Sequence, residues 1–332
     1  MILVTGGTGL IGSHLLFHLV KSGKSVKASY RDKDTINKVS KIFGYYSENP
    51  SALLGKIEWV QADILDIGAF HALFKDVEYV YHCAALISFD PKDYQRLVKI
   101  NIEGTANIVN LCLEYHIKKL CYVSTIAAIG PSPKGSEATE ENEWSDSNVS
   151  VYGLTKHDAE LEVWRGSQEG LPVVVVNPGV VLGPGFWNSG SGTFFKYASK
   201  EKKSFIPGGT GFVTINDVVN AMVMLMESQI VRERFILVNK NLTYKEIFHK
   251  IATGLGVEPP NKKIPFWLLE CLWRMDWLRS KLRGKRRRLT KNMAKGLYRQ
   301  EIYSNQKIKS ALNFEFGDLD AMIDYCCAKF KD

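Results

Sequence analysis

The sequence predicts an α/β fold, in which a doubly wound parallel sheet is followed by a smaller, mainly helical C-terminal cap. Strand-like and helix-like segments alternate from residue 2 to about residue 177. The strand-like segments are continuously apolar, which is typical of parallel strands covered by helices on both faces. After Pro178 the composition changes, and Gly-rich stretches give way to mostly helical sequence.

The individual elements follow from short apolar runs and from helical periodicity. We expect strands at 2–4, 26–30, 57–61, 79–82, 120–124 and 173–176. The helices expected between them lie at 10–21, 68–74, 94–115 and 152–168, an alternation typical of βαβ units. A long irregular insertion occupies 130–150, and loops of that length are often functional. A later helix at 215–227 and a strand at 235–238 return to the sheet.

A glycine-rich turn links the first strand to the first helix. Residues 2–12 read I-L-V-T-G-G-T-G-L-I-G, with the glycines spaced G-x-x-G-x-x-G. Glycine permits a tight turn, the approach of backbone N–H groups to phosphate, and close packing of helix on strand. The helix N-terminus then offers unpaired N–H groups to the phosphates. The turn predicts a dinucleotide bound in a Rossmann-like fold, with contacts from Gly6, Thr8, Gly9, Leu10, Ile11 and Gly12.

Length and composition are those of an ordinary soluble protein. The chain has 332 residues, of which 45% are hydrophobic and 23% are charged. The first strand follows Met1 directly, and no run of about 18 apolar residues occurs, so we expect a cytoplasmic protein. The six cysteines form no C-x-x-C pair, and we expect no metal site.

The net charge of +8 is concentrated in one segment. Residues 279–291 hold eight basic residues and no acidic one, so the rest of the chain is nearly neutral, unlike a nucleic-acid-binding protein. A run with three Trp precedes them at 265–278. A Trp-bearing apolar helix with a cationic flank predicts peripheral contact of 265–291 with an anionic membrane. The alternative is a cap helix that buries its Trp residues over the substrate cleft, with a solvated basic loop.

One constellation indicates acid–base chemistry. Tyr152 and Lys156 stand four residues apart at the start of an expected helix, hence one turn apart on one face. An adjacent ammonium lowers the pKa of a phenol from about 10, and a phenol so tuned is a competent acid or base for a carbonyl–alcohol couple. Ser124 and Thr125 end the fifth strand, at the edge that faces the cofactor crevice. Asn101 lies on the helix before that strand.

The order of these motifs resembles the extended short-chain dehydrogenase/reductases, which belong to the NAD-dependent epimerase/dehydratase family. The matching segments run through nearly the whole chain. They are Thr5–Gly12, Asp63, Cys83-Ala84-Ala85, Asn101, Val123-Ser124-Thr125, Tyr152-Gly153-Leu154-Thr155-Lys156 and Asn177-Pro178-Gly179.

The resemblance implies a role for each matching residue. Tyr152 would be the proton donor or acceptor, and Lys156 would hold the nicotinamide ribose and depress the pKa of the tyrosine. Thr125 would polarise the substrate oxygen, with Ser124 as the neighbouring candidate. Asn101 would support a water relay to Lys156. Further cofactor contacts are implied for Asp63, Ile64, Ala84, Ala85 and Pro178.

The end of the second strand bears on the choice of cofactor. NAD-binding folds place an acidic residue there for the ribose 2′-hydroxyl, but this chain has Tyr30 followed by Arg31. A guanidinium can grip a 2′-phosphate bidentately and stack on adenine. The sequence therefore predicts a preference for NADP(H) over NAD(H), although Asp32 is close by.

The branch of the family follows from two segments. Dehydratases carry Asp-Glu after the strand-five hydroxyl, where this chain has Ile126-Ala127. The segment 174–185 resembles the branch of dihydroflavonol reductases and 3β-hydroxysteroid dehydrogenase-like proteins. Apolar residues expected at the cleft suit an uncharged carbonyl substrate better than a diphosphate; the substrate-binding candidates are Leu86, Phe89, Phe186 and Phe194.

We therefore expect an NADP(H)-dependent oxidoreductase that interconverts a carbonyl and an alcohol on a small lipophilic substrate. Residues 1–178, with 212–240 returning to them, would form the cofactor-binding domain, and 179–211 with 241–332 the substrate-binding cap. A nucleotide-sugar epimerase of the same family is one alternative, and a non-catalytic dinucleotide-sensing protein is another. The sequence leaves open whether the protein forms a homodimer.

Overall fold

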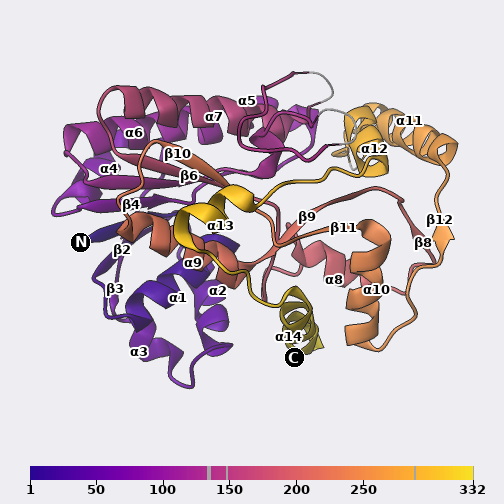
Figure 1. Ribbon diagram of the computed structural model, residues 1–332, viewed down its shortest axis with the longest axis horizontal. Helices are drawn as coiled ribbons and strands as arrows, with labels where there is room; N and C mark the ends of the chain where they lie inside the picture. The colour runs from indigo at the N-terminus through magenta and orange to yellow at the C-terminus, as the bar shows by residue number, and fades with distance from the viewer. Residues whose placement is uncertain (133–135, 147–148, 288, 332) are drawn as a thin grey trace.

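A seven-stranded parallel sheet lies at the centre of the computed structural model, which describes residues 1–132, 136–146, 149–287 and 289–331 (Figure 1). The strand order is β10-β6-β5-β4-β1-β2-β3. The doubly wound sheet expected from the sequence is thus confirmed. The strands are β1 (Ile2–Thr5), β2 (Val26–Tyr30), β3 (Ile57–Gln61), β4 (Tyr79–His82), β5 (Lys119–Val123), β6 (Val173–Pro178) and β10 (Glu233–Leu237).

The order in which the strands are added to the sheet changes side at β1. Val4 pairs with Ala28 of β2 on one side and with Tyr81 of β4 on the other. Strands β2 and β3 lie on one side of β1, and β4, β5, β6 and β10 lie on the other. In parallel sheets ligands bind in the crevice outside the carboxyl ends of the strands at this switch point. The glycine-rich turn and the residues after β4 both lie there.

Helices cover the two faces of the sheet and complete separate parts of the core. Figure 1 shows α4, α6 and α7 above the sheet and α1, α2 and α9 below it. The first group comprises α4 (Ile67–Phe74), α6 (Gly104–Glu114) and α7 (Val151–Gln168). The second comprises α1 (Leu10–Lys21), α2 (Asp34–Gly44) and α9 (Ile215–Glu227), with the short α3 (Pro50–Leu54) beside them.

The helix expected at 94–115 is divided by a π-helical turn. A 3₁₀ turn, η1 (Pro91–Asp93), leads into α5 (Tyr94–Leu97), and the π-helical η2 (Val98–Glu103) follows before α6 begins. At Gly104, where α6 begins, a Cβ would lie 2.5 Å from the Ile64 side chain. Such π turns occur often at functional sites, and this one contains Asn101.

The described part of the insertion at 130–150 is irregular, as expected, and is held by contacts to segments distant in sequence. The Ala138 amide donates to the Ile302 carbonyl at 2.8 Å. A carboxylate oxygen of the buried Glu140 accepts from the Ile236 amide at 2.8 Å. The described part of the insertion is therefore packed on the body; its residues 133–135 and 147–148 lie outside the described residues.

After β6 the chain builds small sheets where the sequence indicated only Gly-rich loops. Strands β7 (Val180–Leu182), β9 (Gly209–Thr214) and β11 (Lys240–Thr243) form a three-stranded sheet, and β8 (Ser204–Phe205) pairs with β12 (Lys262–Lys263). The C-terminal region is otherwise helical, as expected. Its helices are α8 (Gly192–Ala198), α10 (Tyr244–Leu255), α11 (Phe266–Arg283), α12 (Lys291–Tyr298), α13 (Gln306–Leu312) and α14 (Leu319–Lys331).

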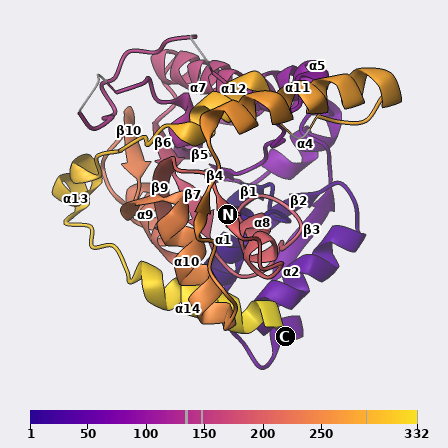
Figure 2. The same ribbon diagram turned by 90° about the vertical axis from the view of Figure 1, so that its right-hand side faces the viewer.

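Helix α11 lies along the upper edge of the molecule and extends beyond its neighbours (Figure 2). Its side chains are largely exposed: Trp267 is 66% and Trp277 is 46% exposed. A cap helix with all its Trp residues buried therefore does not describe it. Within the described part of the chain, no helix has both the length and the hydropathy needed to cross a bilayer. Arg288, one of the eight basic residues, lies outside the described residues.

Candidate active site

The glycine-rich turn between β1 and α1 has the geometry of a phosphate cradle. Gly6 has φ +66°, and a Cβ there would lie 2.6 Å from the Ala84 amide nitrogen. A Cβ at Gly12 would lie 2.2 Å from the Gly6 carbonyl oxygen, so the helix can pack here only on glycine. Gly9 is the N-cap of α1, where it offers no capping side chain and its Cβ direction is nearly open. The turn thus leaves room for an anion at Gly9.

The N-terminus of α1 adds the electrostatics that a pyrophosphate requires. Its first turn carries no acidic residue, and the first N–H groups of any helix have no intrahelical partner. Thr8, Leu10 and Ile11, all partly buried, surround this end. The residues present therefore fit the diphosphate of a dinucleotide.

Tyr152 and Thr125 meet at the carboxyl end of the sheet. Tyr152 stands in the first turn of α7, whose N-cap Ser150 accepts from the Gly153 amide at 3.0 Å. Thr125 follows β5, and its side chain lies near the Tyr152 phenol. Burial raises the pKa of Tyr152 to about 12, against the opposing effect of Thr125, whereas the sequence predicts a value lowered by Lys156. The phenol therefore stays protonated at neutral pH in the protein by itself.

Lys156 is held one turn after Tyr152 in a buried position. Its Nζ donates to the phenol oxygen of Tyr122 at 2.5 Å and to the Val123 carbonyl at 2.9 Å. Burial lowers the pKa of Lys156 to about 7, although the charge of Glu160 opposes that shift. An ammonium poised near neutrality can take up and release a proton at physiological pH.

Tyr122 joins Lys156 to a line of buried polar side chains at the switch point. Its ring lies 5.5 Å from the ring of His82, whose Nε2 is 3.1 Å from the hydroxyl of Thr105. The other ring nitrogen of His82 lies 2.6 Å from the hydroxyl of Thr5, at the end of β1. Burial lowers the pKa of His82 to about 3, so this ring is neutral. The line thus links the glycine-rich turn to Lys156.

Ser124 faces a different partner from that of Thr125. Its hydroxyl donates to Glu160 Oε2 at 2.7 Å. Glu160 is 1% exposed, and it also accepts from Asn177 at 3.1 Å and forms an ion pair with Arg234 at 3.1 Å. Sequence reasoning missed Tyr122, Glu160 and Arg234. Glu160 could have been predicted from the sequence, because a carboxylate four residues after Lys156 shares its helix face.

Asn101 binds the segment that follows β4. Its side-chain oxygen accepts from the Leu86 amide at 2.7 Å, and its amide group donates to the Leu86 carbonyl at 3.1 Å and to Thr155 at 3.2 Å. The side chain thereby fixes the backbone after Ala84 and Ala85 against α7. Pro178, at the end of β6, lies at the same edge of the sheet.

Arg31 and Asp63 lie at the ends of neighbouring strands, with Arg31 Nη1 3.9 Å from Asp63 Oδ2. Both side chains are exposed, at 60% and 41%. The carboxylate of Asp32 accepts from the Asp34 amide at 3.0 Å, before α2. Ile64 is buried against α6.

The four substrate-binding candidates fall in different places. The ring of Phe89 contacts the ring of Tyr152 edge to face, with centroids 5.6 Å apart. The backbone of Leu86 is held by hydrogen bonds to Asn101. Phe186 has φ +55° and is partly buried. Phe194 packs in an aromatic cluster of α8 and α10, with its ring 5.3 Å from that of Phe248. Among the described residues, no group of three or more His, Cys, Asp or Glu side chains is arranged to hold a metal ion.

Comparison with known proteins places this site in a family. The family model of the NAD dependent epimerase/dehydratase family matches residues 2–237. A putative dihydroflavonol 4-reductase of Synechocystis sp. is 27% identical over 274 residues, which are 80% of this chain and 75% of that protein. Tetraketide alpha-pyrone reductase 2 of Arabidopsis thaliana is 31% identical over 260 residues, 74% of this chain and 79% of that protein.

A solved structure has a similar fold. The crystal structure of gox2253 has a TM-score of 0.82 and 25% identity, and the match covers 100% of this chain and 98% of that one. The relatives named reductases indicate an NAD(P)-dependent oxidoreductase of the extended short-chain dehydrogenase/reductase type. The chain belongs to the NAD-dependent epimerase/dehydratase family.

Proposed function

We propose that this protein is an NADP(H)-dependent oxidoreductase that interconverts a carbonyl and an alcohol on a small lipophilic substrate. The observation that carries the proposal is the joint placement of three side chains. Tyr152 lies near the Thr125 side chain, and Lys156 is buried one turn further along the same helix. This arrangement can hold a carbonyl oxygen and give it a proton.

In the reducing direction Tyr152 donates its phenolic proton to the substrate oxygen. The pKa of about 12 keeps that proton in place until the oxygen becomes basic. Thr125 would orient the phenol and the substrate oxygen. Lys156 would hold the nicotinamide ribose and return a proton to Tyr152. A bound nicotinamide supplies or accepts the hydride. Asn101 acts as a positioning residue, since its side chain is used in binding the backbone of Leu86.

The preference for NADP(H) is supported by the end of β2. The exposed guanidinium of Arg31 is suited to a 2′-phosphate. Asp32 lies two residues after the position where NAD-binding folds carry an acid, and its carboxylate accepts from the Asp34 amide at the start of α2. Asp63, beside Arg31, is suited to the adenine amino group. The diphosphate would lie at Gly6, Gly9 and Gly12, and Ile64, Ala84, Ala85 and Pro178 would line the rest of the cofactor.

The substrate class is supported by apolar residues around Tyr152. Phe89 contacts the Tyr152 ring, and Leu86 lies on the same segment after β4. Such a wall suits an uncharged carbonyl compound better than a nucleotide diphosphate. The relatives named dihydroflavonol 4-reductase and tetraketide alpha-pyrone reductase bear names of that kind. Phe186 and Phe194 would contribute from the cap.

We assign the cofactor to residues 1–178 with 212–240, and the substrate cap to 179–211 with 241–332. The proposal includes a cytoplasmic location, the absence of a nucleic-acid partner and contact of 265–291 with an anionic membrane. It leaves open whether the protein forms a homodimer.

The test is a spectrophotometric assay of purified protein with NADPH and a panel of aldehydes, ketones, flavonoids and steroids. We expect oxidation of NADPH with at least one lipophilic carbonyl and a loss of about 10²–10⁴-fold in Tyr152→Phe, with cofactor affinity nearly unchanged. Lys156→Ala should lose turnover and also weaken cofactor binding. If Tyr152→Phe keeps more than about a tenth of the rate, the proton assignment is wrong.

The same preparation discriminates the alternatives. A nucleotide-sugar epimerase would retain bound cofactor through purification and convert a nucleotide sugar without net oxidation of NADPH. A dinucleotide-sensing protein would bind NADPH and turn over neither class of substrate.

A further inference from the structure

Helix α11 presents an apolar stripe to the outside of the molecule. Its members recur at the four- and three-residue spacings of one helix face, and all are exposed: Trp267, Cys271, Met275, Leu278 and Leu282. Met275 is 67% and Leu282 is 74% exposed. Most helices of globular proteins turn such a stripe inward. Here the inward face carries Leu269 and Ser280, the two buried residues of the helix.

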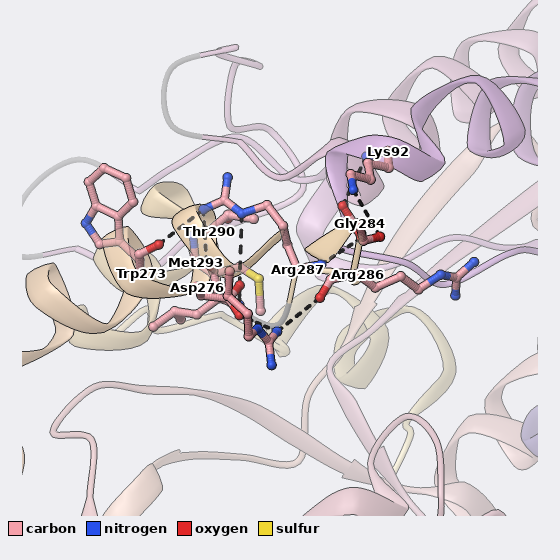
Figure 3. Close-up of polar contacts among 11 residues, drawn as sticks. Lys92, Trp273, Asp276, Gly284, Arg286, Arg287, Thr290 and Met293 are labelled. Atoms are coloured by element: carbon pink, nitrogen blue, oxygen red, sulfur yellow. Dashed lines mark hydrogen bonds and ion pairs between the residues drawn. The ribbon is translucent and has the colours of Figure 1, made fainter. Parts of the chain in front are cut away.

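Polar contacts fix the outward orientation of this stripe. Asp276, on the inward side, pairs with Arg279 at 2.5 Å and accepts from the Leu289 amide at 3.1 Å. After the helix, Arg286 pairs with Asp93 at 3.2 Å. Lys92 donates to the Gly284 carbonyl at 3.4 Å (Figure 3). The last two bonds fasten the segment after α11 to η1, and the Leu289 amide holds Asp276 on the inward side, so turning the stripe inward would break these contacts.

Basic side chains flank the stripe at both of its ends. Lys281, Arg283 and Lys285 lie at the C-terminal end, are exposed, and have no ion pair within the described part of the chain. At the N-terminal end, β12 contributes the exposed Lys262 and Lys263, and β8, which pairs with it, follows the exposed Lys202 and Lys203. At 1.5 Å per residue the helix between these clusters is about 27 Å long.

We propose that α11 binds the surface of an anionic lipid bilayer, lying in the interface with its apolar stripe among the acyl chains and its basic ends at the headgroups. Trp is well suited to this depth, because its ring is apolar and its N–H is polar. A helix of this composition is held by buried apolar area together with attraction to anionic lipid. The inference does not depend on the proposed reductase activity.

A second copy of the chain fits this surface less well. In an antiparallel pairing of two stripes, the cluster at 281–285 of one copy would face the cluster at 262–263 of the other. In a parallel pairing, each cluster would face its own equivalent. Both arrangements bring like charges together around the apolar contact, which costs stability. An anionic surface attracts the basic clusters at both ends of the stripe.

The test is co-sedimentation of the full-length protein with vesicles of phosphatidylcholine, with and without phosphatidylglycerol. We expect binding that requires phosphatidylglycerol, weakens as salt increases, and shifts tryptophan emission to the blue. Met275→Glu with Leu282→Glu should abolish it. Neutralising Lys281, Arg283 and Lys285 to Gln should weaken it about fivefold for each residue, roughly a hundredfold together.

Matched controls separate these effects from misfolding and from general charge. Ile67→Glu with Leu161→Glu places the same two charges on exposed apolar residues of α4 and α7. Replacing Lys38, Lys41 and Lys56 by Gln removes three exposed charges elsewhere. Both should bind vesicles like the parent protein, and thermal melts should show that every variant is folded. Protein that stays in the supernatant at low salt with anionic vesicles overturns the proposal. The proposal is also overturned if the protein does not bind vesicles but forms a concentration-dependent dimer that Leu282→Glu dissociates.

Discussion

The amine of Lys156 lies 2.5 Å from the phenol oxygen of Tyr122, a residue of β5 with no exposed surface. The same amine lies 4.2 Å from the centre of the Tyr122 ring. A buried ammonium is costly unless it is paired or hydrogen-bonded, and Tyr122 with the Val123 carbonyl supplies two of its acceptors. Tyr122 is therefore a positioning residue for Lys156.

Tyr122→Phe should reduce kcat/KM about tenfold or more, because a hydrogen bond to a charged group is worth about 1.5–3 kcal/mol. Losing this acceptor disfavours the ammonium, so the limb of the pH–rate profile that Lys156 governs should move to lower pH. Tyr81→Phe is the matched control, since Tyr81 is an equally buried tyrosine on β4 that packs in the other core cluster. An unmoved pH profile in Tyr122→Phe would show that the contact is structural only.

Arg31→Ala should raise the KM for NADPH by roughly 10- to 150-fold and leave that for NADH nearly unchanged, because it removes a charge-assisted bond to the 2′-phosphate. Folding should not suffer, since the contact with Asp63 joins two exposed side chains. KM values for both cofactors in the parent and the variant measure the effect. Lys33→Ala, an exposed neighbour, is the control, and an equal change for the two cofactors would rule out the phosphate role.

Glu160→Gln should lower the free energy of unfolding by about 3 kcal/mol, because it leaves the Arg234 guanidinium without its buried partner. It also places an amide group against that of Asn177, which now donates to the carboxylate. Urea unfolding measures the change. Glu169→Gln, at the exposed pair with Arg165, should cost less than about 1 kcal/mol. Equal costs at the two sites would contradict the importance of burial.

Acid should destabilise the protein through His14, a buried residue of α1. Burial lowers the pKa of His14 to about 4, although the hydrogen bond to the Leu10 carbonyl opposes this. The unfolded chain takes up a proton near pH 6.5, so stability falls as the pH falls from about 6.5 to 4, by about 3 kcal/mol in all. Unfolding curves across this range should show a shallower slope in His14→Phe. His82 supplies a remaining slope of the same sign, and identical slopes in parent and variant would refute the assignment.

The sheet was predictable because its signals are local. The run Ile2–Gly12 contains strand, turn and helix in one segment, and the paired positions Tyr152 and Lys156 share a helix face at any packing. Thr125 could be placed at the carboxyl edge of the sheet for the same reason.

The contacts that tune the site were not predictable in this way. Tyr122 sits in an apolar strand and looks like an ordinary core residue; only the packing of α7 on β5 brings it to Lys156, 34 positions away. Arg234 meets Glu160 across 74 positions. For α11 the sequence leaves two interpretations, an outward and an inward apolar face, because an apolar periodicity does not say which way the helix is rotated.

The bonds between the segment after α11 and the residues of η1 and its N-cap also affect how the chain folds. Arg287 and Asp90, and Arg286 and Asp93, meet across 197 and 193 positions, so closing this contact costs chain entropy that only a nearly complete structure can repay. Asp90 is 4% exposed and accepts from the Arg287 amide at 2.9 Å. A polypeptide still emerging from the ribosome would hold that carboxylate without its partner until the last fifth of the chain had appeared. We therefore expect the segment beside Phe89 to be among the last parts of the molecule to become ordered, although its residues are synthesised early.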